Sequence, residues 1–169
     1  RWGVTNYYFI DDTVNEDDWK MQKIYEIAQQ LPFQLQWVGY QRADLIYSHP
    51  HQRQWIKDSG CLGTFFGIES LHQEASKTVG KGWSSVHARD FIPELFHNIW
   101  NNQVGVQLSF IAGLPGEDRQ SLENTQQWCI DNKFNEWKFN PLLYHRHLWY
   151  GKVSLIKTLN NMAMSLKTR

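Results

Sequence analysis

Apolar and β-branched residues gather in five short runs, separated by segments in which apolar residues recur every three or four positions. The five runs are Val4 to Ile10, Leu35 to Gly39, Leu62 to Ile68, Val104 to Ala112 and Phe139 to Tyr144. They recur at roughly thirty residues, which is the size of one strand-helix-strand unit. Runs that are apolar at nearly every position are typical of strands buried on both faces, so the pattern predicts a parallel sheet covered by helices.

Helical spacing fills the segments between the runs. We expect Asn15 to cap a first helix and Ser48 to cap a second one that ends at Gly60. A third helix follows the glycine-rich break near residue 80, with Pro93 in its first turn or at a kink. A fourth follows Glu117. The fold class predicted is α/β, with about five strand-helix units in an open parallel sheet or a partial (β/α) barrel.

Residues 1–149 form this predicted core, and residues 150–169 form a helical C-terminal tail of undefined role. Five strands cannot close an eight-stranded barrel of about 250 residues, so the barrel is open or the chain is a piece of a longer one. The strand pattern begins almost at once after Arg1, and we therefore expect something upstream to be missing.

Composition excludes several classes of function. Basic and acidic residues number 17 each, so the zero net charge offers no electrostatic case for a nucleic-acid or membrane partner. Cys61 and Cys129 are the two cysteines in 169 residues, which argues against a disulfide scaffold and favours a reducing, cytoplasmic setting. No apolar run reaches the ~20 residues of a membrane span.

Polar residues follow the predicted strands where parallel α/β folds bind ligands, beyond the carboxyl ends. Asp11 and Asp12 follow the first strand, and aspartates there are also common in turns that lead into a helix. Arg42 follows the second strand, where its planar guanidinium suits a carboxylate or phosphate, or equally a structural ion pair. Glu69 and Ser70 follow the third, after a glycine that lets a ligand approach the backbone.

The fourth strand leads into Ile111-Ala112-Gly113-Leu114-Pro115-Gly116-Glu117, a tight turn whose backbone and apolar edge can flank a flat ring. In order along the chain, Phe-x-Asp-Asp, Gln41-Arg42, Gly-Ile-Glu-Ser and Phe-Ile-x-Gly-Leu-Pro-Gly-Glu resemble the radical S-adenosylmethionine enzymes. The resemblance is closest to the branch often joined to a cobalamin-binding domain, and it covers Tyr7 to about Leu143. Lys77 and Lys81 also fit the family's pattern, although exposed charges explain them as well.

The resemblance implies a small-molecule site and a reaction. Asp11 and Asp12 would border the methionine amino group of the cofactor, and Glu69 and Ser70 would contact its ribose or amino groups. The loop with Ile111, Gly113, Pro115, Gly116 and Glu117 would lie beside adenine, with Arg42 facing cofactor or substrate. The implied cofactors are S-adenosylmethionine, a four-iron four-sulfur cluster and, in that branch, cobalamin. The implied activity is reductive cleavage to a 5′-deoxyadenosyl radical that abstracts hydrogen from an unknown substrate.

The chain departs from the family in one respect. The Cys-x-x-x-Cys-x-x-Cys motif that holds the cluster is absent, and neither Cys61 nor Cys129 is placed to replace it. Without those thiolates the chain cannot start the radical reaction alone. Truncation explains the absence better than evolutionary loss does.

Histidines support a competing hypothesis, a metal-dependent hydrolase. His49-Pro50-His51 and the pair His145 and His147 resemble the His-x-His of zinc sites. The two pairs have no evident common face, so we interpret them as exposed histidines at helix caps and predict no metal ligand. A third hypothesis is a non-catalytic binding domain derived from a barrel.

Overall fold

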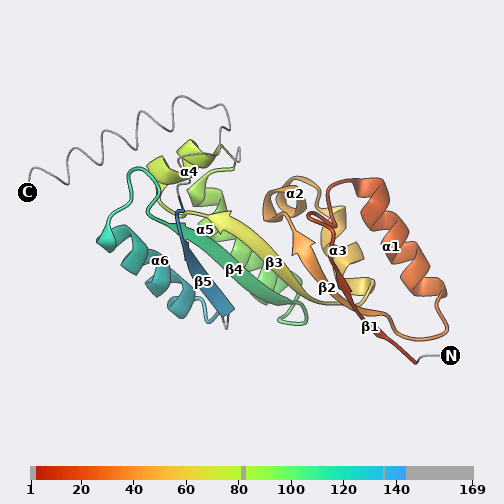
Figure 1. Cartoon of the computed structure of the whole chain (residues 1–169). Coiled ribbons are helices and arrows are strands. Elements are labelled where there is room, and N and C mark those ends of the chain that lie inside the picture. Colours follow the sequence, from red (N-terminus) through yellow and green to blue (C-terminus); the bar gives the residue numbers. More distant parts are fainter. Residues whose placement is uncertain (1–2, 81–82, 135, 144–169) are drawn as a thin grey trace, which may run out of the picture.

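A computed structural model describes residues 3–80, 83–134 and 136–143 (Figure 1). Five strands pair in parallel in the order β1-β2-β3-β4-β5. The strands are β1 (Asn6–Phe9), β2 (Gln36–Gln41), β3 (Cys61–Glu69), β4 (Gly105–Ala112) and β5 (Glu136–Pro141). Each strand lies beside its predecessor in the sequence, which is the commonest arrangement of consecutive strands. The prediction of an α/β fold with five parallel strand-helix units is confirmed, while the tail from residue 150 lies outside the described residues.

Helices connect the strands on one face of the sheet (Figure 1). They are α1 (Asp18–Gln30), α2 (Ala43–Ser48), α3 (His51–Asp58), α4 (Gln73–Val79), α5 (Ser85–Pro93), the π-helix η1 (Glu94–Ile99) and α6 (Arg119–Asp131). Of the two predicted places of Pro93, the first turn is wrong, because Pro93 is the last residue of α5 and the chain continues from it as a π-helix. Proline has no N–H for the regular ladder, and wider turns are one way to accommodate it. None of the described helices has the length and apolar character to cross a membrane.

Two predicted helix caps are wrong. Asn15 does not cap α1, whose preceding residue is Asp17. Instead Asn15 is fully buried, and its side chain bonds the backbone of Arg42 and the side chain of Gln52. Ser48 ends α2 and does not begin a helix, so two short helices replace the single predicted one. The side-chain bonds of Asn15 join residues that are 27 and 37 positions apart in the sequence. Patterns of local helix capping cannot predict contacts over that distance.

The core lies between the helices and one face of the sheet. Its largest fully buried side chains include Trp37, Phe66, Leu108 and Phe110 from the strands and Met21, Ile46, Ile56 and Ile92 from the helices. On the other face, Tyr8 is 56% exposed and Leu62 49% exposed. The expectation that the strands are buried on both faces is therefore wrong for the described residues.

The outer strands also differ from their predicted bounds. β1 is shorter than Val4 to Ile10, and β5 begins three residues before the predicted Phe139. In β5, Trp137 and Phe139 pack against the core, whereas Lys138 lies between them on the open face. This alternation is typical of a strand covered on one side, and a search for continuous apolar runs overlooks it.

Candidate functional site at the carboxyl edge of the sheet

The strand ends predicted to carry the site lie at one edge of the sheet. All four neighbouring pairs are parallel, and their registers run to Phe9 in β1, Gln41 in β2 and Glu69 in β3. Loops leaving these ends therefore start from the same edge. The predicted common edge is confirmed for Asp12, Arg42, Glu69 and Gly113.

The two aspartates after β1 have different surroundings. Asp11 accepts a hydrogen bond from Lys20 Nζ at 2.7 Å and one from the backbone N–H of Thr13 at 3.1 Å. The Lys20 bond, followed by the Thr13 bond, lowers the pKa of the Asp11 carboxyl. Asp11 thus serves the turn that leads into α1. Asp12 lines a groove beside Arg42.

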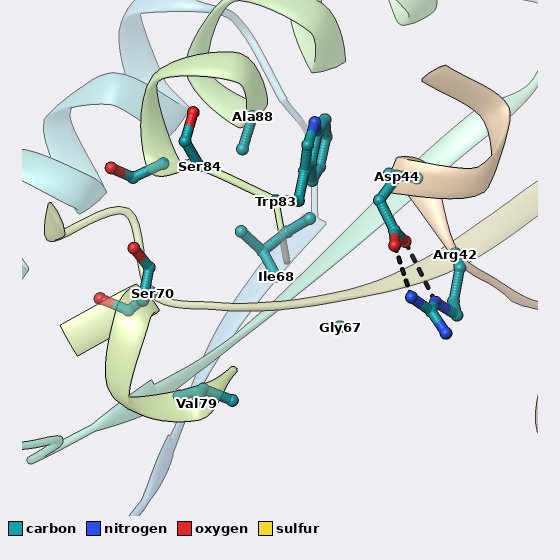
Figure 2. A pocket seen from close by; sticks show the side chains of 12 residues that line it. Arg42, Asp44, Gly67, Ile68, Ser70, Val79, Trp83, Ser84 and Ala88 are labelled. Carbon is teal, nitrogen blue, oxygen red and sulfur yellow. Dashed lines mark hydrogen bonds and ion pairs between the residues drawn. The ribbon is translucent and has the colours of Figure 1, made fainter. Parts of the chain in front are cut away.

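Arg42 forms an ion pair close to its own position in the chain. Its Nε lies 3.1 Å from Asp44 Oδ1, and its Nη2 lies 2.5 Å from Asp44 Oδ2 (Figure 2). The bond to Asp44 raises the pKa of the guanidinium. The Arg42 side chain is still 48% exposed, so its remaining donors can reach a second anion. Arg42 can therefore keep its ion pair with Asp44 and contact a ligand at the same time.

A groove of about 380 Å³ opens at this edge, within the range of small-molecule sites. Its lining comprises Asp12, Thr13, Tyr40, Gln41, Arg42, Phe65, Gly67 and Gly80. Charges of both signs stand beside two aromatic rings, Tyr40 and Phe65, whose centroids are 4.8 Å apart. Gln41 Oε1 is buried without a hydrogen-bond partner among the described residues. This set of groups suits a zwitterion attached to a flat ring.

The site residues predicted from sequence include no aromatic side chain, so Tyr40 and Phe65 were overlooked. The signal that could have found them is the alternation within β2. Trp37 is buried among the helices, whereas Tyr40 is 36% exposed on the open face. Lys138 from β5 lies 5.0 Å from the Phe65 ring centroid on the same face.

Glu69 ends β3 in an unusual backbone conformation. Gly67 pairs with Ser109 and Glu69 pairs with Phe110, so Ile68 is an extra residue in the ladder, a β-bulge. Glu69 has a φ of 68°, in the left-handed region that residues with a side chain seldom adopt. Such strain concentrates where a fold positions a functional group. The bulge changes the direction in which the chain leaves the strand.

Glu117 connects the ends of β3 and β4. One carboxylate oxygen accepts the Ser70 hydroxyl at 2.6 Å, and the other accepts the N–H groups of Gly113 and Leu114, both at 3.1 Å. Ser70 is buried and also accepts the backbone N–H of His72. We name this arrangement the Glu117 clasp. The carboxylate predicted to contact a cofactor is bound by its own loop, and its direct effect is to fix the shape of that loop.

The clasped turn has the shape expected from its glycines. Gly113 and Gly116 have φ values of 97° and 90°, which side chains disfavour. Ile111 lies at the carboxyl end of β4, and Pro115 is buried within the turn. The loop leaves the same edge as the groove, and its contact with adenine stays a prediction.

A smaller pocket lies beside the groove (Figure 2). Its volume of about 30 Å³ has room for roughly two water molecules. Arg42 and Asp44 line one part of it, and Ser70 and Trp83 line others. The indole N–H of Trp83 is buried and has no hydrogen-bond partner among the described residues. No sequence pattern indicated this donor, which follows the glycine-rich break.

The cysteines do not fit an iron-sulfur cluster. Cys61 begins β3, at the opposite end of that strand from Glu69, and Cys129 lies in α6. Both are buried and free, and burial raises the pKa of each thiol to about 12. Cluster ligation requires thiolates that converge on one point. The described part of the chain does not supply them.

His49 and His51 both contact Asp18. Whether the two histidine pairs share a face stays a prediction, because the second pair is not among the described residues. His145 and His147 lie outside the described residues, as does Lys81. Lys77 is 62% exposed and pairs with Glu74, in agreement with an exposed helix charge.

Solved structures similar to this chain include radical S-adenosylmethionine enzymes. TsrM from Kitasatospora setae, a radical S-adenosylmethionine methyltransferase solved with cobalamin and a 4Fe–4S cluster, matches with a TM-score of 0.65 and 12% identity over 82% of this chain and 26% of its own. The same enzyme with tryptophan substrate and the analogue aza-SAM gives the same score and identity over 27% of its length. HemN from Escherichia coli, coproporphyrinogen III oxidase, matches with a TM-score of 0.67 and 11% identity over 98% of this chain and 40% of its own.

The chain thus spans between about a quarter and two fifths of the enzymes that it matches. No family model and no curated protein matches its sequence. The fold of this chain, five parallel strands alternating with helices, is thus similar to part of the fold of these radical S-adenosylmethionine enzymes.

Proposed function

We propose that the chain forms the S-adenosylmethionine-binding wall of a radical S-adenosylmethionine enzyme. The observation that carries the proposal is the groove at the carboxyl edge, where Asp12 and Arg42 stand beside Tyr40 and Phe65. A methionine moiety offers an ammonium and a carboxylate, and adenine offers a flat ring. The fold shared with TsrM and HemN and the order of motifs along the chain both support this assignment.

The residues have distinct proposed tasks. Asp12 accepts hydrogen bonds from the ammonium, and Arg42 uses the donors not engaged by Asp44 to bind the carboxylate. Glu69 and Ser70 border the ribose, and the Ile111 to Gly116 backbone flanks adenine. The Glu117 clasp holds Ser70 and that loop at fixed separation, so both walls are preorganised before the cofactor binds.

The 4Fe–4S cluster, when bound, supplies the electron that cleaves the carbon-sulfur bond of the cofactor. Its thiolates would come from outside this chain, because Cys61 and Cys129 do not fit the role. We therefore expect the isolated chain to be inactive. A reducing cytoplasmic compartment suits both this chemistry and the two free cysteines.

The proposal is tested by calorimetric titration of S-adenosylmethionine into the anaerobically reconstituted protein in the form that its gene encodes. Loss of a charge-assisted hydrogen bond costs about 1.5–3 kcal/mol, which is about ten- to a hundredfold in affinity. We expect Asp12→Asn and Glu69→Gln each to weaken binding by about that factor. The matched control is Lys77→Ala, which removes an exposed charge outside the groove and should leave affinity unchanged. Parent-like binding by both Asp12→Asn and Glu69→Gln would refute the assigned wall.

A further inference from the structure

A second cluster of polar side chains lies in the helix layer, away from the groove. Asp18 is the first residue of α1, His49 is the residue after α2, and His51 is the first residue of α3. Pro50, between the histidines, has a φ of −57° and an αR conformation that begins α3. The rigid turn carries both imidazoles toward the start of α1. Three segments of the chain thereby bring ligand atoms to one point.

The distances are short enough for one ion to contact all three side chains. His49 Nδ1 lies 2.7 Å from Asp18 Oδ1, and His51 Nε2 lies 2.8 Å from Asp18 Oδ2. One ligand atom from each residue lies within 4.8 Å of the other two. Around tetrahedral zinc, ligand atoms about 2.0–2.2 Å from the ion stand roughly 3.4 Å apart. Side-chain rotations that move the ligand atoms by about an ångström or less would therefore convert the hydrogen-bonded cluster into a coordination site.

A buried hydrogen-bond network already orients the carboxylate. Gln52 Nε2 donates to Asp18 Oδ1 at 2.7 Å, and Asn15 Nδ2 donates to Gln52 Oε1 at 2.9 Å. Gln52 and Asn15 are both fully buried. Partners of this kind, placed behind metal ligands, fix their rotamers and strengthen binding. Asn15 also bonds the backbone of Arg42, so the network extends from the cluster to the groove.

We propose that Asp18, His49 and His51 form a binding site for a first-row transition ion of the Zn²⁺ class. Two imidazoles and one carboxylate suit such an ion and not Mg²⁺ or Ca²⁺, which select oxygen ligands. The side chains are 38%, 39% and 47% exposed, so the ion can enter from solvent. Three protein ligands leave a coordination position for water. The site ties the start of α1 to the turn between α2 and α3, independently of the cofactor wall.

The N-terminal ends of α1 and α3 both lie at the site, and their dipoles oppose a cation. The ligands must overcome this repulsion. We therefore expect weaker binding than at a closed structural zinc site with four cysteine or histidine ligands. An affinity set by the imidazoles should fall steeply when either one is removed.

Titration of the full chain with Co²⁺ and Zn²⁺ tests the proposal, with visible absorption reporting Co²⁺ coordination and calorimetry reporting Zn²⁺ stoichiometry. We expect at least a tenfold loss of affinity for one ion per chain in both His49→Ala and His51→Ala. His51 is the most exposed of the three ligands, so we expect its variant to preserve the fold. The matched control is His87→Ala, a histidine of α5 that stacks on Tyr47 outside the cluster.

Zn²⁺ binding in both cluster variants with the affinity of the parent would overturn the proposal, as would the absence of any saturable site in the parent. Loss of binding in His145→Ala or His147→Ala alone would also overturn it. S-adenosylmethionine binding is measured separately by titration into the reconstituted protein. The two titrations therefore show separately whether the metal-site proposal or the cofactor-wall proposal has failed.

Discussion

The Glu117 clasp offers the sharpest test of how the two loop walls are held. Glu117→Ala removes the acceptor of three hydrogen bonds, those from Ser70, Gly113 and Leu114. The Ser70 side chain and Leu114 are buried, whereas Gly113 is exposed and its N–H can bond water instead. A buried donor without a partner costs about 1–3 kcal/mol. Two of them give an expected loss of about 2–4 kcal/mol in the free energy of unfolding, allowing for relaxation.

Glu117→Gln removes the negative charge of the side chain and keeps its size and shape. The amide oxygen can still accept the two backbone N–H groups, but the bonds become neutral and lose about 1 kcal/mol each, so we expect a loss of about 2 kcal/mol. Urea unfolding followed by tryptophan fluorescence measures both variants, since the chain holds nine tryptophans. Glu123→Gln, which breaks an exposed ion pair with Arg119, is the control and should change stability by less than about 0.5 kcal/mol. A Glu117→Ala variant as stable as that control would refute the clasp.

Two further predictions concern titratable groups. A hydrogen bond from the backbone N–H of Ser121 lowers the pKa of the Asp118 carboxyl. The stabilising effect of Asp118 is therefore complete above the unfolded pKa of about 3.9 and is lost as pH falls through the lower folded value. Asp118→Asn keeps a good helix cap without that titration, and we expect its thermal midpoint to fall less steeply in acid than the parent's. Because burial raises the pKa of Cys61 and Cys129 to about 12, both thiols stay protonated near neutral pH, and we expect iodoacetamide to label neither in the folded chain.

Controls for these two measurements are available within the chain. Asp131→Asn changes a carboxylate at the other end of α6, and the acid slope should stay that of the parent. An unchanged slope in Asp118→Asn would place the acid sensitivity elsewhere. For the thiols, mass spectrometry in urea should show both cysteines labelled. Labelling at the rate of a free cysteine without denaturant would contradict their burial.

The sheet and its functional edge were predictable from sequence because both follow from local pattern and topology. Strands spaced at the length of one strand-helix-strand unit pair in parallel, and parallel pairing sends every loop after a strand to the same edge. Asp12, Arg42 and Glu69 therefore needed no tertiary information to be grouped. Their individual partners did need it. Arg42 pairs with Asp44 only because α2 begins directly after β2.

The rest of the site depends on contacts between distant segments. Asn15 carries the sequence signature of a helix cap, yet a buried position beside Gln52, 37 residues later, satisfies its amide instead. Asp18 lies 31 residues before His49, and no spacing rule connects them. Short polar side chains compete for local and distant partners, and packing decides which partner is chosen. Patterns within one element cannot record that outcome.

The β-bulge at Ile68 has a consequence for how this chain tolerates change in its gene. Substitution at Ile68 leaves the number of residues before Glu69 unaltered, and the carboxylate keeps its place. Deletion of that single codon would remove the bulge and leave Glu69 opposite Phe110 in a regular ladder, so the chain would leave the strand in another direction. In a library of variants, we expect this segment to accept many missense changes and to reject in-frame deletions of the same size. In this segment the number of residues matters to the structure more than which residue stands at Ile68.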